Sequence, residues 1–219
     1  MKIRQARIED IDKIFDLEKR VWKSNAATEQ NITSRIKLFP KGSIVAEENG
    51  EIVGYVSGII INQKLLETAN TWYEFTDNGD GKSVFDPCGD VLFGISLTVD
   101  DRLRNKQVGS KLMLNIARMA IENNLEYGML GGRLPYYYRF KDMPVDKYIK
   151  AKNESGHLLD PELRFYTRLG LKIIKVKENY FKDPESLDYG VILQWENPFY
   201  KITRYLPFLA KPLSYLFRI

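Results

Sequence analysis

A strand, a polar turn and an amphipathic helix follow one another directly between residues 91 and 122, and this succession constrains the fold more than any other segment of the chain. Residues 91–99 are almost wholly apolar, which predicts a buried strand. Residues 100–110 are mainly polar, with basic side chains and a glycine. The helix that follows has an apolar face and a polar face, formed by Leu112, Met113, Ile116, Ala117 and Ala120 on one side and by Lys111, Asn115, Arg118 and Glu122 on the other.

The polar turn of residues 100–110 is a candidate anion site. The first turn of a helix has N–H groups without intrahelical partners, and the helix dipole places partial positive charge there. Such a turn suits a pyrophosphate, and the basic side chains add to the attraction. On the local pattern alone, a solvated basic turn is an equal alternative.

The rest of the chain predicts an α/β domain with strands and helices in a defined order. Asn49-Gly50 lies between two apolar runs and is the strongest short hairpin signal available. Gly170 closes a helix as a C-terminal cap. The predicted elements are a strand at 2–7, helices at 9–22 and 28–38, strands at 43–48 and 51–61, a loop at 62–89, a strand at 127–132, a helix at 161–168, and strands at 171–176 and 189–195.

Composition places the chain among globular proteins, with 44% hydrophobic and 28% charged residues. The single cysteine, Cys88, excludes an internal disulfide and favours a reducing compartment, and the start of the chain has no apolar leader segment. We therefore expect a cytoplasmic protein. His157 is the single histidine, so neither a closed zinc site nor a histidine-based triad is expected, and no metal is predicted.

The charge of the chain is concentrated at its C-terminal end. The net charge is +4, and residues 197–219 contain four cations and no acid, so residues 1–196 are neutral. This is not the broad basic surface of a nucleic-acid binder. We predict a domain at 1–196 and a basic, aromatic tail at 197–219. The tail suits peripheral contact with a membrane surface, and packing on its own domain or on a partner chain, as in a homodimer, is an equal alternative.

Two motifs in the chain resemble those of the GNAT superfamily of N-acetyltransferases. Residues 104–109 lie where that family has Arg/Gln-x-x-Gly-x-Gly/Ala, and residues 165–171 (Phe-Tyr-Thr-Arg-Leu-Gly-Leu) resemble its Tyr-x-x-x-Gly-Phe element. More narrowly, Gly131-Gly132-Arg133-Leu134-Pro135 and Gln194-Trp195-Glu196-Asn197-Pro198 are similar to acetyltransferase domains found beside carbon–nitrogen hydrolases. The resemblance implies a mixed, mostly antiparallel sheet of about seven strands flanked by helices.

The same resemblance implies transfer of an acetyl group from acetyl-CoA to a primary amine by direct attack on the thioester. Tyr166 would protonate the leaving thiolate, with a packed core aromatic as the alternative. Asp90 is the first candidate for the general base, with a role in capping the strand end at least as well supported, and deprotonation through water would need no single residue. Acetyl-CoA would contact the main chain of Leu97, Thr98 and Val99, and its pyrophosphate would be held by Arg104, Asn105, Lys106, Gln107, Val108, Gly109 and Ser110.

Two features leave alternatives open. Gln107 stands where the family has a glycine, so it either adopts a standard conformation or accepts strain of order 1 kcal/mol. An acyl-CoA-binding or regulatory module without turnover is therefore the competing function. The tyrosine-rich insertion at 133–146 either lines the acceptor pocket or covers the edge of the sheet.

Overall fold

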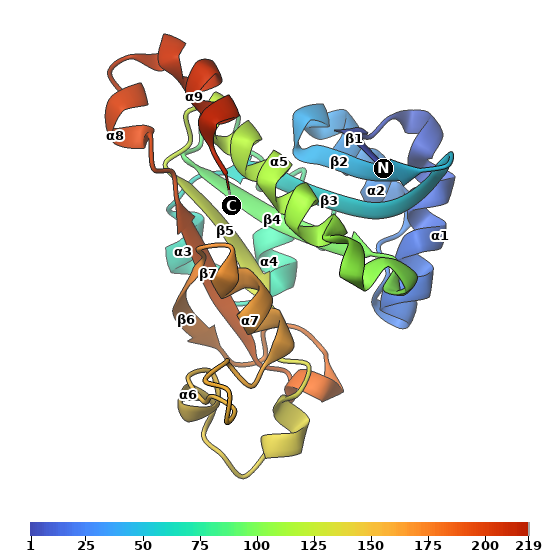
Figure 1. Ribbon diagram of the computed structural model, residues 1–219, viewed down its shortest axis with the longest axis vertical. Coiled ribbons are helices and arrows are strands. Elements are labelled where there is room, and N and C mark those ends of the chain that lie inside the picture. Colours follow the sequence, from blue (N-terminus) through green and yellow to red (C-terminus); the bar gives the residue numbers. More distant parts are fainter. Residues whose placement is uncertain (219) are drawn as a thin grey trace.

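The computed structural model describes residues 1–218, except for the side chains of residues 104–106. The described strands form a single sheet in the order β1-β2-β3-β4-β5-β7-β6, in which only β4 and β5 pair in parallel. The expectation of a mixed, mostly antiparallel sheet of seven strands flanked by helices is confirmed (Figure 1). The strands are β1 (Lys2–Gln5), β2 (Ser43–Glu48), β3 (Glu51–Ile61), β4 (Val91–Val99), β5 (Tyr127–Gly132), β6 (Lys172–Lys177) and β7 (Gly190–Glu196).

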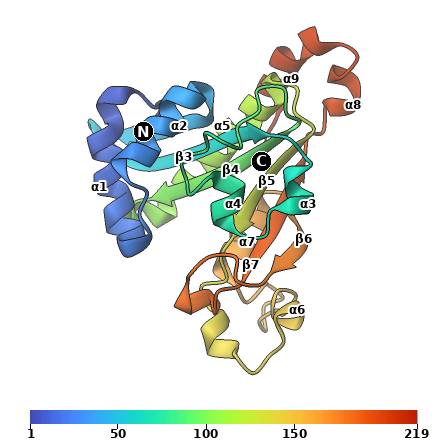
Figure 2. The same cartoon turned by 180° about the vertical axis from the view of Figure 1, so that it is seen from behind.

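Helices cover both faces of this sheet, as the two opposite views in Figures 1 and 2 show. α5 and α7 pack on one face, whereas α1, α2 and α4 pack on the other. The helices are α1 (Ile11–Trp22), α2 (Glu29–Leu38), α3 (Leu65–Thr68), α4 (Trp72–Thr76), α5 (Val108–Glu122), α6 (Val145–Tyr148), α7 (Pro161–Arg168), α8 (Tyr200–Thr203) and α9 (Ala210–Leu216).

The alternation of side chains along the strands determines these two layers. In β2, Ile44 and Ala46 pack into the cluster beneath α5, while Val45 between them packs with Ile14 and Leu17 of α1. Successive residues of a strand point to opposite faces, so a strand buried on both sides carries an uninterrupted apolar run. The central strands β2, β3 and β4 are largely of this kind, and the site is built on this part of the sheet.

The structure shifts the bounds of several predicted elements by one or two residues, and it differs from the prediction more clearly in two places. Residues 62–89, predicted as a loop, contain the short helices α3 and α4. α4 begins at a reciprocal capping box in which the Thr71 hydroxyl accepts from the Glu74 N–H and the Glu74 carboxylate accepts from the Thr71 N–H. The helix after β4 begins at Val108 rather than Ser110, because Gln107 has a left-handed conformation that ends the turn before the expected start of the helix.

Candidate functional site

The parallel pairing of β4 with β5 ends part-way along both strands, at Gly94 and Leu130, although β4 continues to Val99. The pairing of β4 with β3 is also irregular next to this point, between Ser57 and Gly58. Two cavities lie here, and their linings share Ile95, Ser96, Leu97, Gly131 and Tyr166. The two cavities therefore meet where β4 and β5 separate.

The two cavities differ in chemistry and lie toward different helices. The first, which we name the apolar cavity, has a volume of about 80 Å³ and lies toward α5 and α7; its lining includes Val56, Leu92, Met113, Ile116, Ala117, Ala120, Leu130, Leu169 and Trp195. The second, the polar cavity, has a volume of about 300 Å³ and lies toward α1, α2 and α4. Its lining includes Glu18, Trp22, Asn31, Trp72, Tyr73, Arg133, Glu162, Phe181 and Lys182.

The turn between β4 and α5 leads to the N-terminus of the helix. The first hydrogen bond within α5 runs from the Lys111 N–H to the Gln107 carbonyl, so the N–H groups of Val108, Gly109 and Ser110 precede the helical ladder. Gln107 has φ +56°, so of the two conformations open to it the left-handed one is adopted. The predicted contributions of Arg104, Asn105 and Lys106 lie outside the described residues.

The N-terminal part of that turn is organised by Asp100. Its carboxylate accepts from the Arg102 N–H at 3.0 Å and from the Arg102 guanidinium at 2.6 and 2.9 Å. The hydrogen bonds from Arg102 lower the pKa of Asp100 to about 2, so its carboxylate is charged at neutral pH. Asp100 Oδ2 also lies 3.6 Å from Nη2 of Arg20 on α1, so an ion pair links this end of the turn to the helix.

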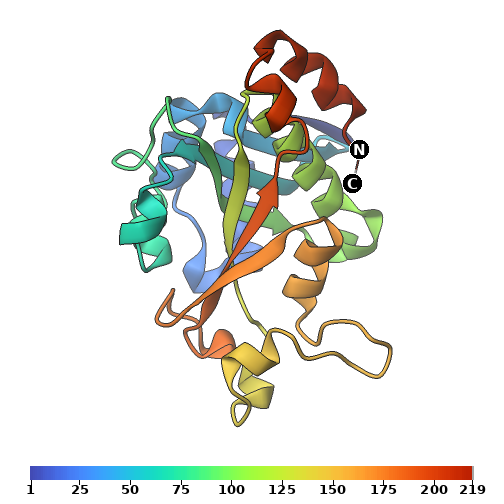
Figure 3. The ribbon, with the colours of Figure 1, turned by 90° about the vertical axis from the view of Figure 1, so that its left-hand side faces the viewer.

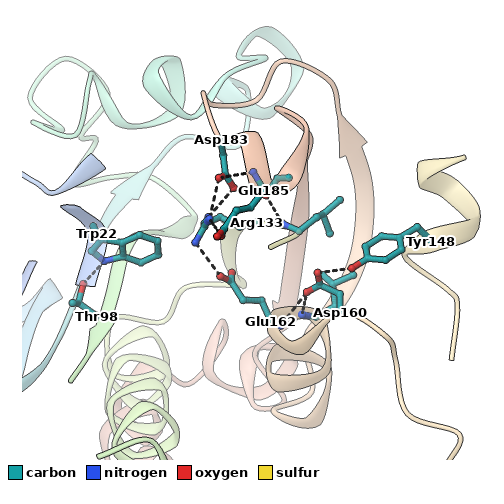
Figure 4. Close-up of polar contacts among 11 residues, drawn as sticks. Trp22, Thr98, Arg133, Tyr148, Asp160, Glu162, Asp183 and Glu185 are labelled. Carbon is teal, nitrogen blue, oxygen red and sulfur yellow. Dashed lines mark hydrogen bonds and ion pairs between the residues drawn. The ribbon is translucent and has the colours of Figure 1, made fainter. Parts of the chain in front are cut away.

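Glu18 of α1, which lines the polar cavity, accepts hydrogen bonds from two side chains of β4. The Ser96 hydroxyl donates to Glu18 Oε1 at 2.8 Å, and the Thr98 hydroxyl donates to the same oxygen. The Trp22 indole N–H donates to Thr98 Oγ1 at 2.7 Å (Figure 4). Of the three predicted β4 residues, Leu97 lines both cavities, Thr98 is buried in this network, and Val99 packs toward α5.

Arg133 also lines the polar cavity, where its guanidinium lies 5.5 Å from the centre of the Trp22 ring, and it is held by acids of the loop before β7. Its guanidinium donates to both oxygens of Asp183, at 2.9 and 3.0 Å, and to Glu185 Oε2 at 2.9 Å (Figure 4). Of the insertion at 133–146, Arg133 lines the cavity, whereas Tyr137 is buried and donates its hydroxyl to the Met143 carbonyl. The insertion thus supplies one cavity residue, and buried Tyr137 supports the covering role.

Glu162 and Tyr166 lie four residues apart on α7 and both line the polar cavity. Residues with this spacing are neighbours on the surface of a helix. Tyr166 lines both cavities and is 9% exposed, and the Glu162 carboxylate lies 3.9 Å from Arg133 with 27% of its side chain exposed. Burial raises the pKa of Glu162 to about 7, although the Arg133 guanidinium acts in the opposite direction. Burial, together with the Glu162 charge, also raises the pKa of Tyr166, which keeps its phenol protonated.

Asp90 lies apart from this arrangement. It directly precedes β4, at the end of the strand opposite Leu97–Val99, and its Oδ1 accepts from the Gln63 N–H at 2.9 Å. It is not among the described residues that line the two cavities, so the structure does not bring it together with Tyr166. Glu162 was missed in the sequence, where its one signal is the four-residue spacing to Tyr166.

The chain is similar to known proteins along most of its length. Residues 8–135 match the model of the Acetyltransferase (GNAT) family. The chain is 32% identical to the uncharacterized N-acetyltransferase YkwB of Bacillus subtilis (strain 168), over 92% of this chain and 91% of that protein. It is 30% identical to the probable hydrolase YhcX of the same organism, over 90% of this chain and 39% of that protein.

Two solved structures are also similar over most of the chain. The loading GNATL domain of CurA from Lyngbya majuscula superposes with a TM-score of 0.81 at 27% identity, covering 90% of this chain and 97% of that domain. The GphF GNAT-like decarboxylase in complex with isobutyryl-CoA superposes with a TM-score of 0.77 at 26% identity, covering 90% of this chain and 100% of that one.

Proposed function

The chain belongs to the acetyltransferase (GNAT) family, and from this premise we propose that it transfers an acetyl group from acetyl-CoA to a primary amine by direct attack on the thioester. The observation that supports this reaction is the meeting of the two cavities at Tyr166, where β4 and β5 separate. A two-substrate transfer without a covalent enzyme intermediate needs both reactants to reach one point from different sides.

In this proposal the apolar cavity receives the acyl-pantetheine arm and the polar cavity receives the amine. The main chain of Leu97, Thr98 and Val99 would bind the pantetheine amides, beyond the point where β4 pairs with β5. The N–H groups of Val108, Gly109 and Ser110 would bind the pyrophosphate, together with Gln107 and the basic turn before it.

We place the general base at Glu162 rather than at Asp90, because Glu162 lines the polar cavity one helical turn from Tyr166. The Glu162 carboxylate would take a proton from the ammonium, directly or through one water. The neutral nitrogen then forms the C–N bond, the C–S bond breaks, and the leaving thiolate takes its proton from the Tyr166 hydroxyl. The second proton that the nitrogen loses as the amide forms passes to the Tyr166 oxygen, directly or through water, and the proton held by Glu162 is released to solvent. A carboxylate whose pKa is about 7 is suited to this step at neutral pH.

Release of free thiol from acetyl-CoA, measured with a panel of primary amines, tests the reaction. Glu162→Gln, Asp90→Asn and Tyr166→Phe are compared, with binding of acetyl-CoA measured separately by calorimetry. The proposal predicts that all three variants bind acetyl-CoA as the unchanged protein does. Turnover should be slow in Glu162→Gln and Tyr166→Phe and unchanged in Asp90→Asn. Binding of acetyl-CoA without turnover of any amine would favour the acyl-CoA-binding module instead.

A second candidate reaction is decarboxylation of an acyl-CoA that carries a free carboxylate. It is favoured by the similarity to the GphF GNAT-like decarboxylase, at a TM-score of 0.77 and 26% identity. In this case Arg133, which borders the polar cavity, would hold the carboxylate before carbon dioxide is released. Formation of acetyl-CoA from malonyl-CoA in the absence of any amine would support this reaction over N-acetylation.

A further inference from the structure

The C-terminal segment of residues 197–218 is anchored to the domain along one side. The Ser214 hydroxyl donates to Glu122 of α5 at 3.0 Å, and Arg118 of α5 donates to the Phe217 carbonyl at 3.1 Å. The rings of Trp195 and Phe217 lie edge to face with centroids 5.3 Å apart. α9 is thus held against α5, while α8 and the turn into α9 project beyond the end of the sheet (Figures 1 and 3).

The same segment exposes many large apolar side chains. Phe208 is 72% exposed, Tyr205 70% and Leu216 68%, and these values are the largest among the exposed apolar side chains of the described chain. Ile202, Leu206 and Tyr215 are also exposed. We name these six residues the outer apolar surface. A concentration of large exposed apolar side chains in one short segment usually marks a surface that another body covers.

The charges around the outer apolar surface indicate what covers it. Lys201, Arg204, Lys211 and Arg218 are all exposed, and residues 197–219 contain no acid. A symmetric contact between two copies of this segment would bring four cations against four cations, and like charges across an interface oppose association. A surface of anionic lipid headgroups offers the complementary charge together with an apolar interior.

We propose that the outer apolar surface docks on the surface of an anionic lipid bilayer. Tyrosine rings suit the headgroup region because each has an apolar body and a polar tip, and Phe208 and Leu216 would enter the boundary of the acyl chains. The chain would lie on the bilayer, since none of the helices within the described residues is long and apolar enough to cross a membrane. This proposal does not depend on the reaction proposed for the cavities.

Flotation of the full chain with vesicles tests the docking. Vesicles of phosphatidylcholine with phosphatidylglycerol are compared with vesicles of phosphatidylcholine alone, at low and high salt. The chain is expected to float with the anionic vesicles at low salt and to be released by salt. Replacement of Lys201 and Arg204 by Gln is expected to weaken the partition about fivefold for each cation removed. Failure to bind anionic vesicles would overturn the proposal.

A matched pair of apolar variants shows whether the outer apolar surface itself carries the docking. Phe208→Ser with Leu216→Ser is expected to lower the partition by about tenfold or more, whereas Ile174→Ser, which removes a side chain that is 49% exposed on β6, is expected to leave it unchanged. Thermal unfolding of both variants checks that each is folded before its partition is compared. Equal loss in both variants would overturn the proposal. The proposal would also be overturned if sedimentation without vesicles showed a dimer and if Phe208→Ser with Leu216→Ser abolished that dimer.

Discussion

The apolar cavity and the polar cavity are built in different ways. The apolar cavity draws most of its lining from β4, β5 and α5, so it follows from a segment that is nearly continuous in the sequence. The polar cavity collects side chains from α1, α2, α4 and α7, from Arg133 and from the loop at 181–182. One side of the site thus belongs to a local motif, whereas the other exists only in the folded chain. A substitution in one cavity should therefore change the properties of that cavity and leave those of the other cavity unchanged.

The largest separation of the two sides is expected from Glu162→Gln. Loss of the general base should lower kcat by about 10²–10⁴-fold at neutral pH, while the dissociation constant of acetyl-CoA stays unchanged because the apolar cavity is untouched. Glu185→Gln is the matched control, since Glu185 also pairs with Arg133 but is 59% exposed. Steady-state kinetics and calorimetry measure both constants. An equal loss of kcat in the two variants would mean that Glu162 acts through its ion pair with Arg133 and not through proton transfer.

The pH dependence sharpens the same comparison. Because the pKa of Glu162 is about 7 in the folded chain, kcat/KM should fall below that pH as the carboxylate takes up its proton, and this inflection should be lost in Glu162→Gln.

The same raised pKa makes the stability of the protein depend on pH. The folded chain holds the proton of Glu162 more tightly than the unfolded chain, so the free energy of unfolding decreases as pH rises from the unfolded pKa through 7. Glu162→Gln should therefore be the more stable protein above pH 7, by up to about 3 kcal/mol. Urea denaturation at pH 5 and pH 8 measures the difference in the free energy of unfolding between Glu162→Gln and the unchanged protein. If this difference is the same at both pH values, it does not arise from the raised pKa of Glu162.

A smaller effect is expected from the hydrogen bonds that join β4 to α1 beside the polar cavity. Thr98→Val keeps the shape of the side chain but removes one hydrogen bond to Glu18 and one from Trp22. Burying these groups with fewer partners should lower the free energy of unfolding by about 1–3 kcal/mol. Thr167→Val, which removes a hydroxyl that donates to the Leu163 carbonyl on α7, serves as the control and should cost less. Equal losses would show that the network at Glu18 has no special weight.

The smallest effect is expected on the other side, at Gln107. A non-glycine residue in the left-handed conformation costs about 1 kcal/mol, and glycine also gains freedom in the unfolded chain, so Gln107→Gly should stabilise the fold by about 0.5 kcal/mol. Gln107→Ala retains the same backbone cost and should show no gain. Thermal unfolding compares the two variants. A change in the KM of the amine would contradict the separation of the two sides, because Gln107 lies in the turn that leads to α5.

The contrast between the cavities also explains what could be predicted from the sequence. The strands at 43–48, 51–61, 91–99 and 127–132 were predicted with their observed bounds, because apolar runs and turn residues specify them locally. The sequence could not decide between a standard and a left-handed backbone conformation for Gln107, and the structure shows the left-handed one. Glu162 could not be distinguished from other surface acids of a helix, because its burial and its ion pair with Arg133 arise only when segments far apart in the sequence pack together. The capping box at Thr71 and Glu74 was visible in the sequence but was missed within a segment rich in turn residues.

Tyr166→Phe gives the most direct test of the claim that the two cavities form one reaction site. The substitution removes a single hydroxyl from the one side chain of α7 that lines both cavities. We expect kcat for acetyl transfer to fall by about 100-fold or more, with the dissociation constant of acetyl-CoA and the free energy of unfolding little changed. An unchanged kcat would contradict the claim, because the cavities would then meet at a point where no proton is delivered.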